Sequence, residues 1–502
     1  MLAIIDSGSL HGVDALPIQV EVNTGERGEL RWVIVGLPDA AVKESQNRVF
    51  SALGNCGFSL PISRTTINLA PGDLKKEGLI YDLPIALAII SATQQAQLTH
   101  ASEFLIAGEL SLSGKTRPIP GAFNLALLAK KMKKRGVILP AECASVATFV
   151  EGVEVYEMEH LRDCVDFLRG AKPLSPLTRE TKIEEAPIVH DLSAIHGQQI
   201  LKRAVEIAVA GNHNILLMGP PGCGKSMIAK CIPDLMPPAT QEEWLDILKI
   251  QSACGLPIDI AHRRRPFRSP HHNVSDAGLI GGGIIPKPGE ISLAHNGVLF
   301  LDELPEFKRT VLEMLRQPLE NGEVTIVRSN GKLTFPCRAL CIAAMNPCPC
   351  GYFGSRQRRC TCSQKQIQQY RSRISGPLLD RFDLQIEVQP VDLSAFQSAP
   401  SFAESSQKVR QRIIKARQWQ QERANCVNAY LSAAQIEKYC GCTQQNLAWL
   451  QKACEQLQLS ARAYHKVLKI ARTIADLEEA ASVEQKHLME AMQYRCLDRS
   501  WK

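Results

Sequence analysis

The chain has 502 residues, of which 45% are hydrophobic and 22% are charged, and its formal net charge is +7 at pH 7. These fractions are typical of a globular protein and exclude a disordered, fibrous or collagen-like chain. The most apolar stretch, residues 83–90, is far shorter than the ~18 residues of a membrane helix, and the N-terminus lacks the pattern of a signal peptide. We therefore expect a cytoplasmic protein of about three domains that has no membrane partner.

The seventeen cysteines are expected to be reduced thiols or metal ligands and not a disulfide framework, since no export signal is recognised. The net charge is modest for a nucleic-acid binder of this length, so the places where basic residues gather matter more than the total. Two such segments are 262–268 and 356–373. A basic run is usually a solvated surface, and contact with nucleic acid is the alternative.

Residues 1–170 carry short apolar or alternating runs, such as 18–22 and 30–35, between helical stretches near 40–53 and 124–135. Runs of this kind mixed with helices predict an α+β domain.

Two segments of this part, 76–89 and 108–121, resemble the two catalytic segments of the Lon protease domain, which has a ribosomal S5 domain 2-like fold. Ile80 stands where that family has its nucleophilic serine, and Phe123 stands where it has its lysine base. Neither side chain can attack a carbonyl or take a proton. We therefore expect the scaffold without protease activity.

Residues 171–187 are polar and rich in proline, which predicts a linker. Residues 191–210 then have a helical pattern that leads into the next motif, and the spacing predicts one apolar face formed by Ile195, Ile200, Leu201, Ala204, Ile207 and Ala208. The stretch 195–197 is a candidate contact for an adenine ring, and a plain core helix is the equally good alternative.

A phosphate-binding loop of the pattern G-x-x-x-x-G-K-[ST] lies between an apolar run, 215–218, and a helical stretch, 227–231. The glycines allow backbone N–H groups to turn toward phosphates, Lys225 can reach the β- and γ-phosphates, and the Ser226 hydroxyl can ligate Mg²⁺. We therefore expect an ATP site with Mg²⁺ on the loop residues Gly219, Pro220, Pro221, Gly222, Cys223, Gly224, Lys225 and Ser226.

Two further apolar runs end in polar residues that fit the same site. Asp302 and Glu303 follow the run 298–301, and Asn346 follows the run 339–345. Ligands of parallel sheets bind where the strands end, so these side chains are expected beside the phosphates. We assign Asp302 to Mg²⁺, Glu303 to the activation of the attacking water, and Asn346 to its orientation.

Two arginines are candidates for contact with the γ-phosphate. Arg381 precedes an apolar stretch and could reach the nucleotide of a neighbouring subunit in a ring, with a salt bridge to Asp380 or Asp383 as the alternative. Beyond residue 391 the chain is mainly helical, and Ser460 is a plausible N-cap for a helix that carries Arg462 in its exposed first turn. We expect Arg462 to sense the nucleotide of its own chain.

Together these residues resemble the ComM (YifB) family of magnesium-chelatase-like AAA+ ATPases. The resemblance covers nearly the whole chain and depends most on six motifs, at 191–198, 219–226, 268–283, 288–303, 346–351 and 378–383.

The resemblance implies an α/β fold class: a P-loop AAA+ module at 188–392, a Lon protease-like, S5 domain 2-like domain at 1–170 without its catalytic dyad, and a helical C-terminal lid at 393–502. It also implies a catalytic set, namely Lys225, Glu303, Asn346, Arg381 and Arg462.

The same resemblance implies a homo-hexamer that acts on DNA. The function it implies is that of a helicase, which uses ATP hydrolysis to drive branch migration during homologous recombination in natural transformation. Two other classes stay open: the motor subunit of a metal chelatase, and an AAA+ ATPase that remodels proteins.

Two segments have the pattern of hairpins that could contact DNA. One, 281–291, carries Lys287 between two prolines, and the other, 323–335, has an Asn-Gly turn between Arg328 and Lys332. In a hexamer each cation would be presented six times, which suits sequence-independent binding of single-stranded, duplex or branched DNA. Tips that are merely solvated are the alternative.

Two C-x-C pairs, Cys348 with Cys350 and Cys360 with Cys362, follow Asn346. Four thiolates can bind Zn²⁺ tetrahedrally, and a metal would stabilise the segment 351–359, which has little apolar content. The spacing is tighter than the usual C-x-x-C, and four free thiols are the alternative.

Overall fold

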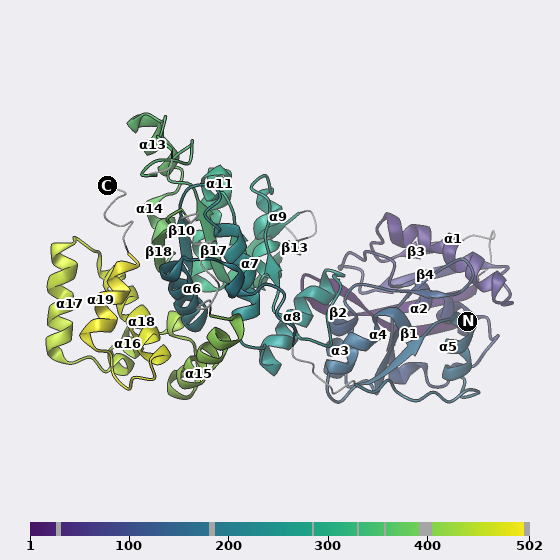
Figure 1. Cartoon of the computed structure of the whole chain (residues 1–502). Helices are drawn as coiled ribbons and strands as arrows, with labels where there is room; N and C mark the ends of the chain where they lie inside the picture. The colour runs from purple at the N-terminus through teal and green to yellow at the C-terminus, as the bar shows by residue number, and fades with distance from the viewer. Residues whose placement is uncertain are drawn as a thin grey trace. The chain divides into compact units, whose positions relative to one another are not determined.

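The computed structural model describes residues 1–26, 32–179, 186–283, 286–328, 331–355, 358–390 and 404–495, with the side chains of residues 26, 328 and 331 outside the description. The chain forms two compact units (Figure 1). The first contains Met1–Ile183 and Trp244–Ala261, and the second contains Glu184–Glu243 and His262–Lys502. None of the helices described here is long and apolar enough to cross a membrane.

The first unit is α+β. Its largest sheet has the order β1-β2-β4-β3, and a second, parallel sheet has the order β5-β8-β9. The strands are β1 (Leu2–His11), β2 (Asp14–Glu26), β3 (Trp32–Val35), β4 (Arg64–Ala70), β5 (Phe104–Ile106), β6 (Glu109–Leu110), β7 (Thr116–Arg117), β8 (Gly136–Pro140) and β9 (Glu154–Met158). Its N-terminal segment contains the longer α-helices α1 (Ala40–Asn55), α2 (Asp82–Ala92), α3 (Ala122–Lys131) and α5 (Leu161–Leu168).

Helix α2 is buried along nearly its whole length because its residues are almost all apolar. Ile80, just before α2, and Phe123, on α3, are both buried in this unit. Their side chains are hydrocarbon, so neither offers a nucleophile or a base. The S5 domain 2-like assignment itself stays a prediction.

A distant segment completes the first unit. Helix α8 (Gln241–Ala253) contributes Trp244, which is buried and faces the Phe149 ring at 6.4 Å between centroids. The backbone of Ser252 accepts a hydrogen bond from Gly121 N at 2.7 Å, and Asn124 Nδ2 donates to Lys249 O at 2.9 Å. Residues that lie between two ATP-site motifs in the sequence therefore fold with the N-terminal unit.

The second unit is built on a five-stranded sheet whose paired strands are all parallel, in the order β11-β14-β17-β10-β18. The strands are β11 (Phe267–Arg268), β14 (Val298–Leu301), β17 (Leu340–Met345), β10 (Ile215–Met218) and β18 (Leu384–Glu387). Strands β10, β14 and β17 are buried on both faces, as their continuous apolar sequences require. The strands predicted in these three runs are confirmed.

The helix expected over 191–210 is shorter than predicted. Residues Leu192–Ala194 form a single 3-10 turn, and α6 (Gln199–Gly211) begins only after Gly197 and Gln198, whose φ angles of 65° and 53° are left-handed. Ile200, the second residue of α6, is exposed and does not belong to the buried face. The other five apolar positions are buried as predicted.

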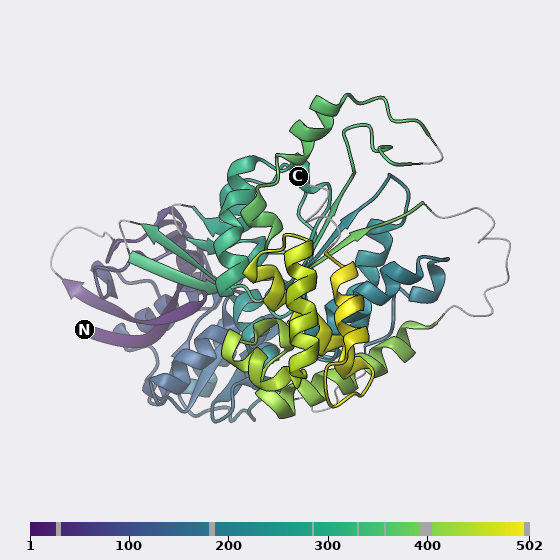
Figure 2. The ribbon, with the colours of Figure 1, turned by 90° about the vertical axis from the view of Figure 1, so that its left-hand side faces the viewer.

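Five longer helices form the C-terminal part of the second unit (Figure 2). They are α15 (Ser406–Ala424), α16 (Ala433–Cys440), α17 (Gln444–Gln456), α18 (Ala461–Leu477) and α19 (Gln485–Gln493). Helix α18 is central among them, and its predicted N-cap is confirmed because Ser460 Oγ accepts a hydrogen bond from Ala463 N at 3.2 Å.

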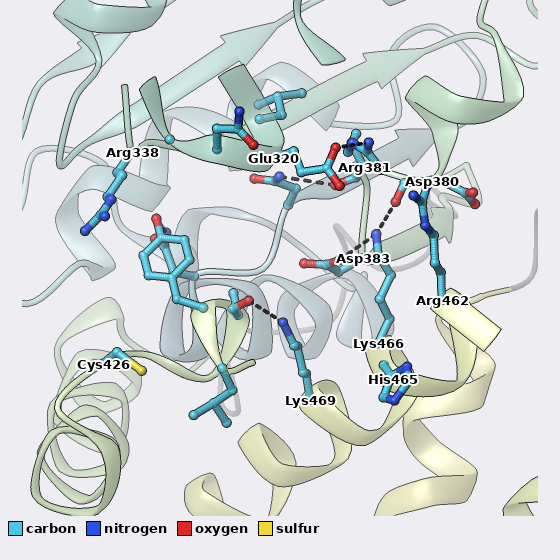
Figure 3. Close-up of a pocket in the computed structure, with 18 of the residues that line it drawn as sticks. Glu320, Arg338, Asp380, Arg381, Asp383, Cys426, Arg462, His465, Lys466 and Lys469 are labelled. Atoms are coloured by element: carbon cyan, nitrogen blue, oxygen red, sulfur yellow. Dashed lines mark hydrogen bonds and ion pairs between the residues drawn. The ribbon is translucent and has the colours of Figure 1, made fainter. Parts of the chain in front are cut away.

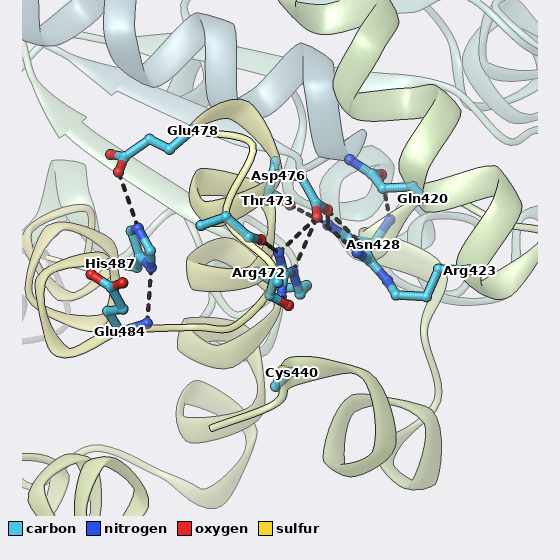
Figure 4. A network of polar contacts seen from close by, with 12 residues as sticks. Gln420, Arg423, Asn428, Cys440, Arg472, Thr473, Asp476, Glu478, Glu484 and His487 are labelled. Carbon is cyan, nitrogen blue, oxygen red and sulfur yellow. Dashed lines mark hydrogen bonds and ion pairs between the residues drawn. The ribbon is translucent and has the colours of Figure 1, made fainter. Parts of the chain in front are cut away.

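A buried carboxylate holds these helices together. Asp476 accepts hydrogen bonds from Arg423 at 2.7 and 2.8 Å, from Arg472 at 3.1 Å and from Asn428 at 2.8 Å (Figure 4). Two arginines and an amide satisfy the charge of one carboxylate, which is the condition under which a buried charge is tolerated. The network joins α15 to α18 and therefore fixes the position of α18 relative to α15.

Candidate active site

The predicted ATP-site residues meet at one edge of the five-stranded sheet. Because β10, β14 and β17 are parallel neighbours, their carboxyl ends lie together. Gly219 follows β10, Asp302 follows β14 and Asn346 follows β17. We call this the carboxyl edge, and it is where ligands of open α/β sheets bind.

The loop after β10 has the backbone that its glycines permit. Gly222 and Gly224 have φ angles of 78° and 89°, which disfavour any residue with a Cβ atom. A Cβ atom on Gly219 would lie 2.5 Å from Val388 O. Helix α7 (Lys225–Leu235) begins at the last two residues of the loop, so its free N–H groups are available for an anion.

Lys225 lies folded over this loop. Its Nζ donates to Gly219 O at 2.7 Å, to Pro220 O at 2.9 Å and to Asn346 Oδ1 at 3.3 Å. Burial lowers the pKa of the Lys225 ammonium. The contacts bring Lys225 and Asn346 together, as the sequence predicted, and the carbonyl oxygens that Lys225 contacts are partners that a phosphate can replace.

Ser226 and Asp302 are in direct contact. Ser226 Oγ donates to Asp302 Oδ2 at 2.7 Å, and Asp302 Oδ1 accepts from Glu303 N at 3.0 Å. A hydroxyl and a carboxylate side by side at a phosphate loop are oxygen ligands of the kind that Mg²⁺ prefers. The donor set therefore fits Mg²⁺, and the roles of both residues stay predictions.

The side chain of Glu303 is half exposed, and its backbone has a left-handed φ of 52°. Its carboxylate faces His272, whose Nδ1 lies 3.3 Å from Glu303 Oε2. Sequence reasoning gave His272 no role. The sequence offers one signal, the His-His pair at 271–272, but its spacing gives no reason to connect the pair with Glu303.

The opposite end of the sheet, which we call the amino edge, carries a cleft of about 680 Å³ (Figure 3). The cleft is lined by Asn214, Arg338 and Asp383, which directly or closely precede β10, β17 and β18. It also contains the predicted arginine finger, Arg381, and four side chains from the start of α18, namely Arg462, His465, Lys466 and Lys469.

Arg381 does not pair with either neighbouring aspartate. Its guanidinium forms an ion pair with Glu320 and donates to Arg316 O at 3.4 Å. The salt bridge that we considered as the alternative is therefore made with a different acid, which lies at the end of α12 (Arg316–Asn321). The sequence spacing to Glu320 gave no sign of this contact.

Arg462 is exposed in the first turn of α18, as predicted, but it lies in the amino-edge cleft with Arg381. We expected it beside the nucleotide of its own chain, and the structure places it at the other end of the sheet. The reason is the attachment of α18: Lys466 Nζ lies 2.8 Å from Asp383 Oδ1, and His213 Nε2 lies 2.8 Å from Thr473 Oγ1.

Asp383 is the centre of this attachment. Besides Lys466, it faces His213, whose Nδ1 lies 3.4 Å from Asp383 Oδ2. Burial acts to raise the pKa of Asp383, but Lys466 and His213 outweigh burial and hold that pKa well below its usual range. The carboxylate therefore stays ionised and ties α18 to the start of β18.

Both segments predicted as hairpins contain a pair of antiparallel strands, but Gly331, which we placed in the turn, pairs with Arg328 in the strands, and Asn330 lies outside the described residues. Strands β12 (Gly281–Gly282) and β13 (Lys287–Pro288) are antiparallel, as are β15 (Glu323–Arg328) and β16 (Gly331–Pro336). Lys287 and Lys332 are exposed, and the side chain of Arg328 lies outside the described residues. Their contact with DNA stays a prediction.

The four cysteines of the two C-x-C pairs gather into one cluster, with sulfur atoms within 4.8 Å of one another. The Sγ atom of Cys348 lies 3.4 Å from that of Cys350 and 3.7 Å from that of Cys360. Backbone N–H groups of Tyr352 and Thr361 lower the pKa of the Cys350 thiol. Tetrahedral Zn²⁺ with Zn–S bonds of about 2.3 Å requires sulfur atoms about 3.8 Å apart, so the cluster fits this ion.

Family models for the ChlI subunit of magnesium chelatase match the chain in three places. The model for magnesium chelatase, subunit ChlI, matches residues 191–396. The model for subunit ChlI of Mg-chelatase matches residues 20–143, and the ChlI C-terminal model matches residues 403–495.

Relatives resemble the chain over its full length. The Competence protein ComM of Haemophilus influenzae is 45% identical over 99% of this chain and 98% of its own length. YifB of Escherichia coli is 42% identical over 99% of this chain and 98% of its own length. Rv2897c of Mycobacterium tuberculosis is 36% identical over 97% of each chain.

Proposed function

Since the chain belongs to the magnesium chelatase ChlI family, with ComM and YifB as full-length relatives, we propose that it is an ATPase that forms a ring and moves DNA. The observation that carries this proposal is the division of the polar groups between the two edges of one sheet. The phosphate loop, Asp302, Glu303 and Asn346 lie at the carboxyl edge. Arg381 and Arg462 lie at the amino edge.

The chemistry of the carboxyl edge follows from its contacts. ATP would displace the loop carbonyls from Lys225, whose ammonium then binds the β- and γ-phosphates. Mg²⁺ held by Ser226 and Asp302 would neutralise phosphate charge. Glu303 would accept a proton from the attacking water, and Asn346, already in contact with Lys225, would orient that water.

The amino edge would supply the arginines that act on the nucleotide of a neighbouring subunit. Phosphoryl transfer is accelerated by an arginine that neutralises charge on the γ-phosphate. Arg381 and Arg462 are at the wrong end of the sheet to reach the nucleotide of their own chain, but the amino edge of one subunit can face the carboxyl edge of the next. A closed ring, for which a hexamer is the family expectation, would then complete every site.

DNA is the substrate that we favour. The name of the Haemophilus influenzae relative connects it with competence, and exposed Lys287 and Lys332 on two hairpins suit a phosphate backbone. We therefore assign the chain to branch migration of recombination intermediates after DNA uptake. A metal-chelatase motor is the second candidate, favoured by the name of the family models.

A branch-migration assay tests this function. Purified chain with ATP and Mg²⁺ should separate three-way and four-way junctions, and DNA should stimulate its ATP hydrolysis. ATP hydrolysis that is indifferent to DNA, with no action on junctions or on a forked duplex, would instead favour the chelatase motor.

We also assign structural Zn²⁺ to Cys348, Cys350, Cys360 and Cys362, whose sulfur spacing fits the ion. The cluster adjoins the ATP site, because a Cβ atom on Gly351 would lie 2.7 Å from Pro221 Cδ in the phosphate loop. The chelator-washed protein should hold about one Zn²⁺ per chain, and a Cys360→Ser variant should hold much less, while Cys143→Ser in the first unit should not change the content. Less than about half a Zn²⁺ per chain in the parent protein would contradict the assignment.

A further inference from the structure

The segment that follows Asn346 carries a further group of cations. Between Asn346 and Leu379 the sequence has six lysines or arginines and no aspartate or glutamate. The proposed function gives these cations no role. We propose that part of this segment binds single-stranded DNA as a surface separate from the two hairpins. The surface, which we call the cysteine-loop surface, consists of Tyr352, Phe353, Arg358, Arg359 and Lys365. The inference rests on the proposed function, because that function supplies DNA as the partner.

Contacts within the cysteine cluster hold this surface together. The backbone N–H of Phe353 donates to Cys348 Sγ at 3.3 Å, and that of Cys350 donates to Cys362 Sγ at 3.4 Å. The two aromatic residues closely follow one C-x-C pair, and the two arginines directly precede the other. Since the four sulfur atoms gather in one cluster, the aromatic rings and the guanidinium groups are brought to the same place.

Helix α13 (Gln364–Arg371) carries the last cation of the surface. The side chains of Ile367 and Tyr370 are buried, and the exposed positions of the helix hold Lys365 and glutamines. Glutamine amides can donate hydrogen bonds to phosphate oxygens. The helix stands away from the five-stranded sheet in both views (Figure 1, Figure 2), so the sheet does not cover its exposed face.

Two arginine–aromatic pairs give the surface its chemical character. The Arg358 guanidinium lies 4.8 Å from the centroid of the Tyr352 ring, and the Arg371 guanidinium lies 5.3 Å from that of the Phe353 ring. Phe353 is 37% exposed, which leaves part of an apolar ring in water. Unpaired bases stack on aromatic rings and on guanidinium planes, whereas the bases of a duplex already stack on one another. The rings therefore favour a single strand.

The charge of the surface fits the backbone of such a strand. Arg358, Arg359 and Lys365 are exposed, and the sequence around them has no acid that could neutralise them locally. Arg373, near the end of the segment, pairs with Glu306 at 3.0 Å and is not part of the surface. A DNA backbone supplies a negative charge at every phosphate, whatever the sequence. An acidic protein would satisfy the cations but would offer no bases to the rings.

Binding of a fluorescein-labelled oligothymidylate of about 30 nucleotides, followed by anisotropy, tests the inference. The double variant Arg358→Ala, Arg359→Ala should bind about tenfold more weakly than the parent. Its slope of log affinity against log salt should fall by about 1.4, since each phosphate contact to a single strand contributes about 0.7. Phe353→Ala should weaken binding about tenfold with an unchanged slope, and Phe353→Tyr should keep the parent affinity. The double variant Lys408→Ala, Lys452→Ala is the matched control, because it removes two exposed cations from α15 and α17.

Several results would overturn the inference. The same affinity in the arginine double variant and in its lysine control would mean that the surface makes no contact of its own. An equal loss of affinity for a duplex of the same length, with no effect of Phe353→Ala, would mean that no base stacks there. Phe353 also lines a small recess with Gly219 and Pro220, so a changed KM for ATP with unchanged DNA affinity would assign the ring to the nucleotide site. Polyglutamate that competes as well as unlabelled oligothymidylate would identify an acidic protein as the partner.

Zinc content and thermal melting of each variant identify a loss of the cysteine cluster. In that case Lys365→Ala, on α13, decides alone, with an expected loss of affinity of about threefold. The unmodified protein tests the proposed function separately. If it neither binds DNA nor acts on junctions, the DNA motor is refuted. If it does both, while the arginine double variant binds as the parent does, only the cysteine-loop surface is refuted.

Discussion

The two edges of the five-stranded sheet carry opposite kinds of site. At the carboxyl edge the polar groups are paired with one another, Lys225 with Asn346 and Ser226 with Asp302. At the amino edge a cleft is lined by several cations, of which Arg462 is exposed and Arg381 is held by a glutamate. One edge pairs its polar groups around the phosphate-loop sequence, and the other gathers cations in a cleft.

If the proposed function is right, this difference means that neither edge is a complete site. On the proposed function the carboxyl edge supplies the base and the phosphate ligands, and the amino edge supplies the arginines that act on the γ-phosphate. Complementary halves at opposite ends of one sheet are what a head-to-tail ring requires, since every interface then joins one edge of each kind. Four substitutions test the comparison, in order of decreasing expected effect.

Arg381→Ala should have the largest effect. Loss of an arginine that acts on the γ-phosphate lowers kcat by about a thousandfold or more. The decisive measurement is ATP hydrolysis in a mixture of Arg381→Ala with Lys225→Ala. Each variant alone is inactive, but an interface that takes its phosphate loop from the first and its arginine from the second is intact, so the mixture should recover activity.

The outcome of mixing separates the two arrangements of the arginine. A mixture that stays as inactive as its components, although the two variants co-assemble, would mean that Arg381 does not act on the nucleotide of a neighbouring subunit. The proposed division of roles between the two edges would then be wrong. Arg462→Ala should behave as Arg381→Ala does in the same experiment, because both side chains lie in the amino-edge cleft.

Glu303→Gln should come second. The amide cannot accept the proton of the attacking water, so kcat should fall by about a hundredfold or more while ATP binding is retained. Binding of a fluorescent ATP analogue and single-turnover hydrolysis give the two quantities. Glu306→Gln is the control, because Glu306 is three residues away and pairs with Arg373 at 3.0 Å. Hydrolysis at the parent rate by Glu303→Gln would show that Glu303 is not the base.

The sequence predicted the carboxyl edge well for a physical reason. Its strands are continuous apolar runs, the loop has a fixed glycine pattern, and the polar residues directly follow the strands, so short-range pattern determines which groups meet. The three predicted strands are confirmed, and the structure pairs Lys225 with Asn346 and Ser226 with Asp302. The helical pattern failed where backbone conformation interrupts it, at Gly197 and Gln198.

The amino edge could not be predicted in this way. Its contacts join residues far apart in the chain, such as Arg381 with Glu320, His213 with Thr473 and Lys466 with Asp383. Local periodicity predicts that Arg462 is exposed on α18. It does not predict which end of the five-stranded sheet α18 packs against. The contact between His272 and Glu303, and the packing of Trp244 with the N-terminal unit, were missed for the same reason.

Asp383→Asn tests whether the amino edge is a fixed structure. The change removes the charge that Lys466 and His213 face, and breaking a buried pair costs about 3 kcal/mol of the free energy of unfolding. The folded pKa of Asp383 is lowered, so its contribution is present above the unfolded pKa of about 3.9 and is lost as the pH falls below it. Urea denaturation should therefore show a large difference from the parent at pH 7 and a smaller one at pH 3.

Asp380→Asn is the matched control for this experiment, since Asp380 lies in the same cleft with its side chain more exposed. A difference between the parent and Asp383→Asn that is equal at pH 7 and pH 3 would mean that Asp383 supports α18 by shape and not by charge. The attachment of the amino edge would then be independent of the ionised carboxylate.

Lys332→Ala should have the smallest effect, and it concerns the hairpin attached to the amino edge. Gly322 and Cys337, which flank strands β15 and β16, line the cleft that contains Arg381, whereas the β12–β13 hairpin leads to His272 and the carboxyl edge. Loss of one phosphate contact should weaken DNA binding about threefold and reduce the slope of log affinity against log salt by about one. Lys408→Ala on α15, an exposed lysine on another surface, should change neither quantity. Since the change removes a contact to DNA and no group of the ATP site, hydrolysis at saturating DNA should stay at the parent rate. Weaker DNA binding with an unchanged salt slope would mean that Lys332 makes no phosphate contact and that the amino-edge hairpin does not bind the DNA backbone.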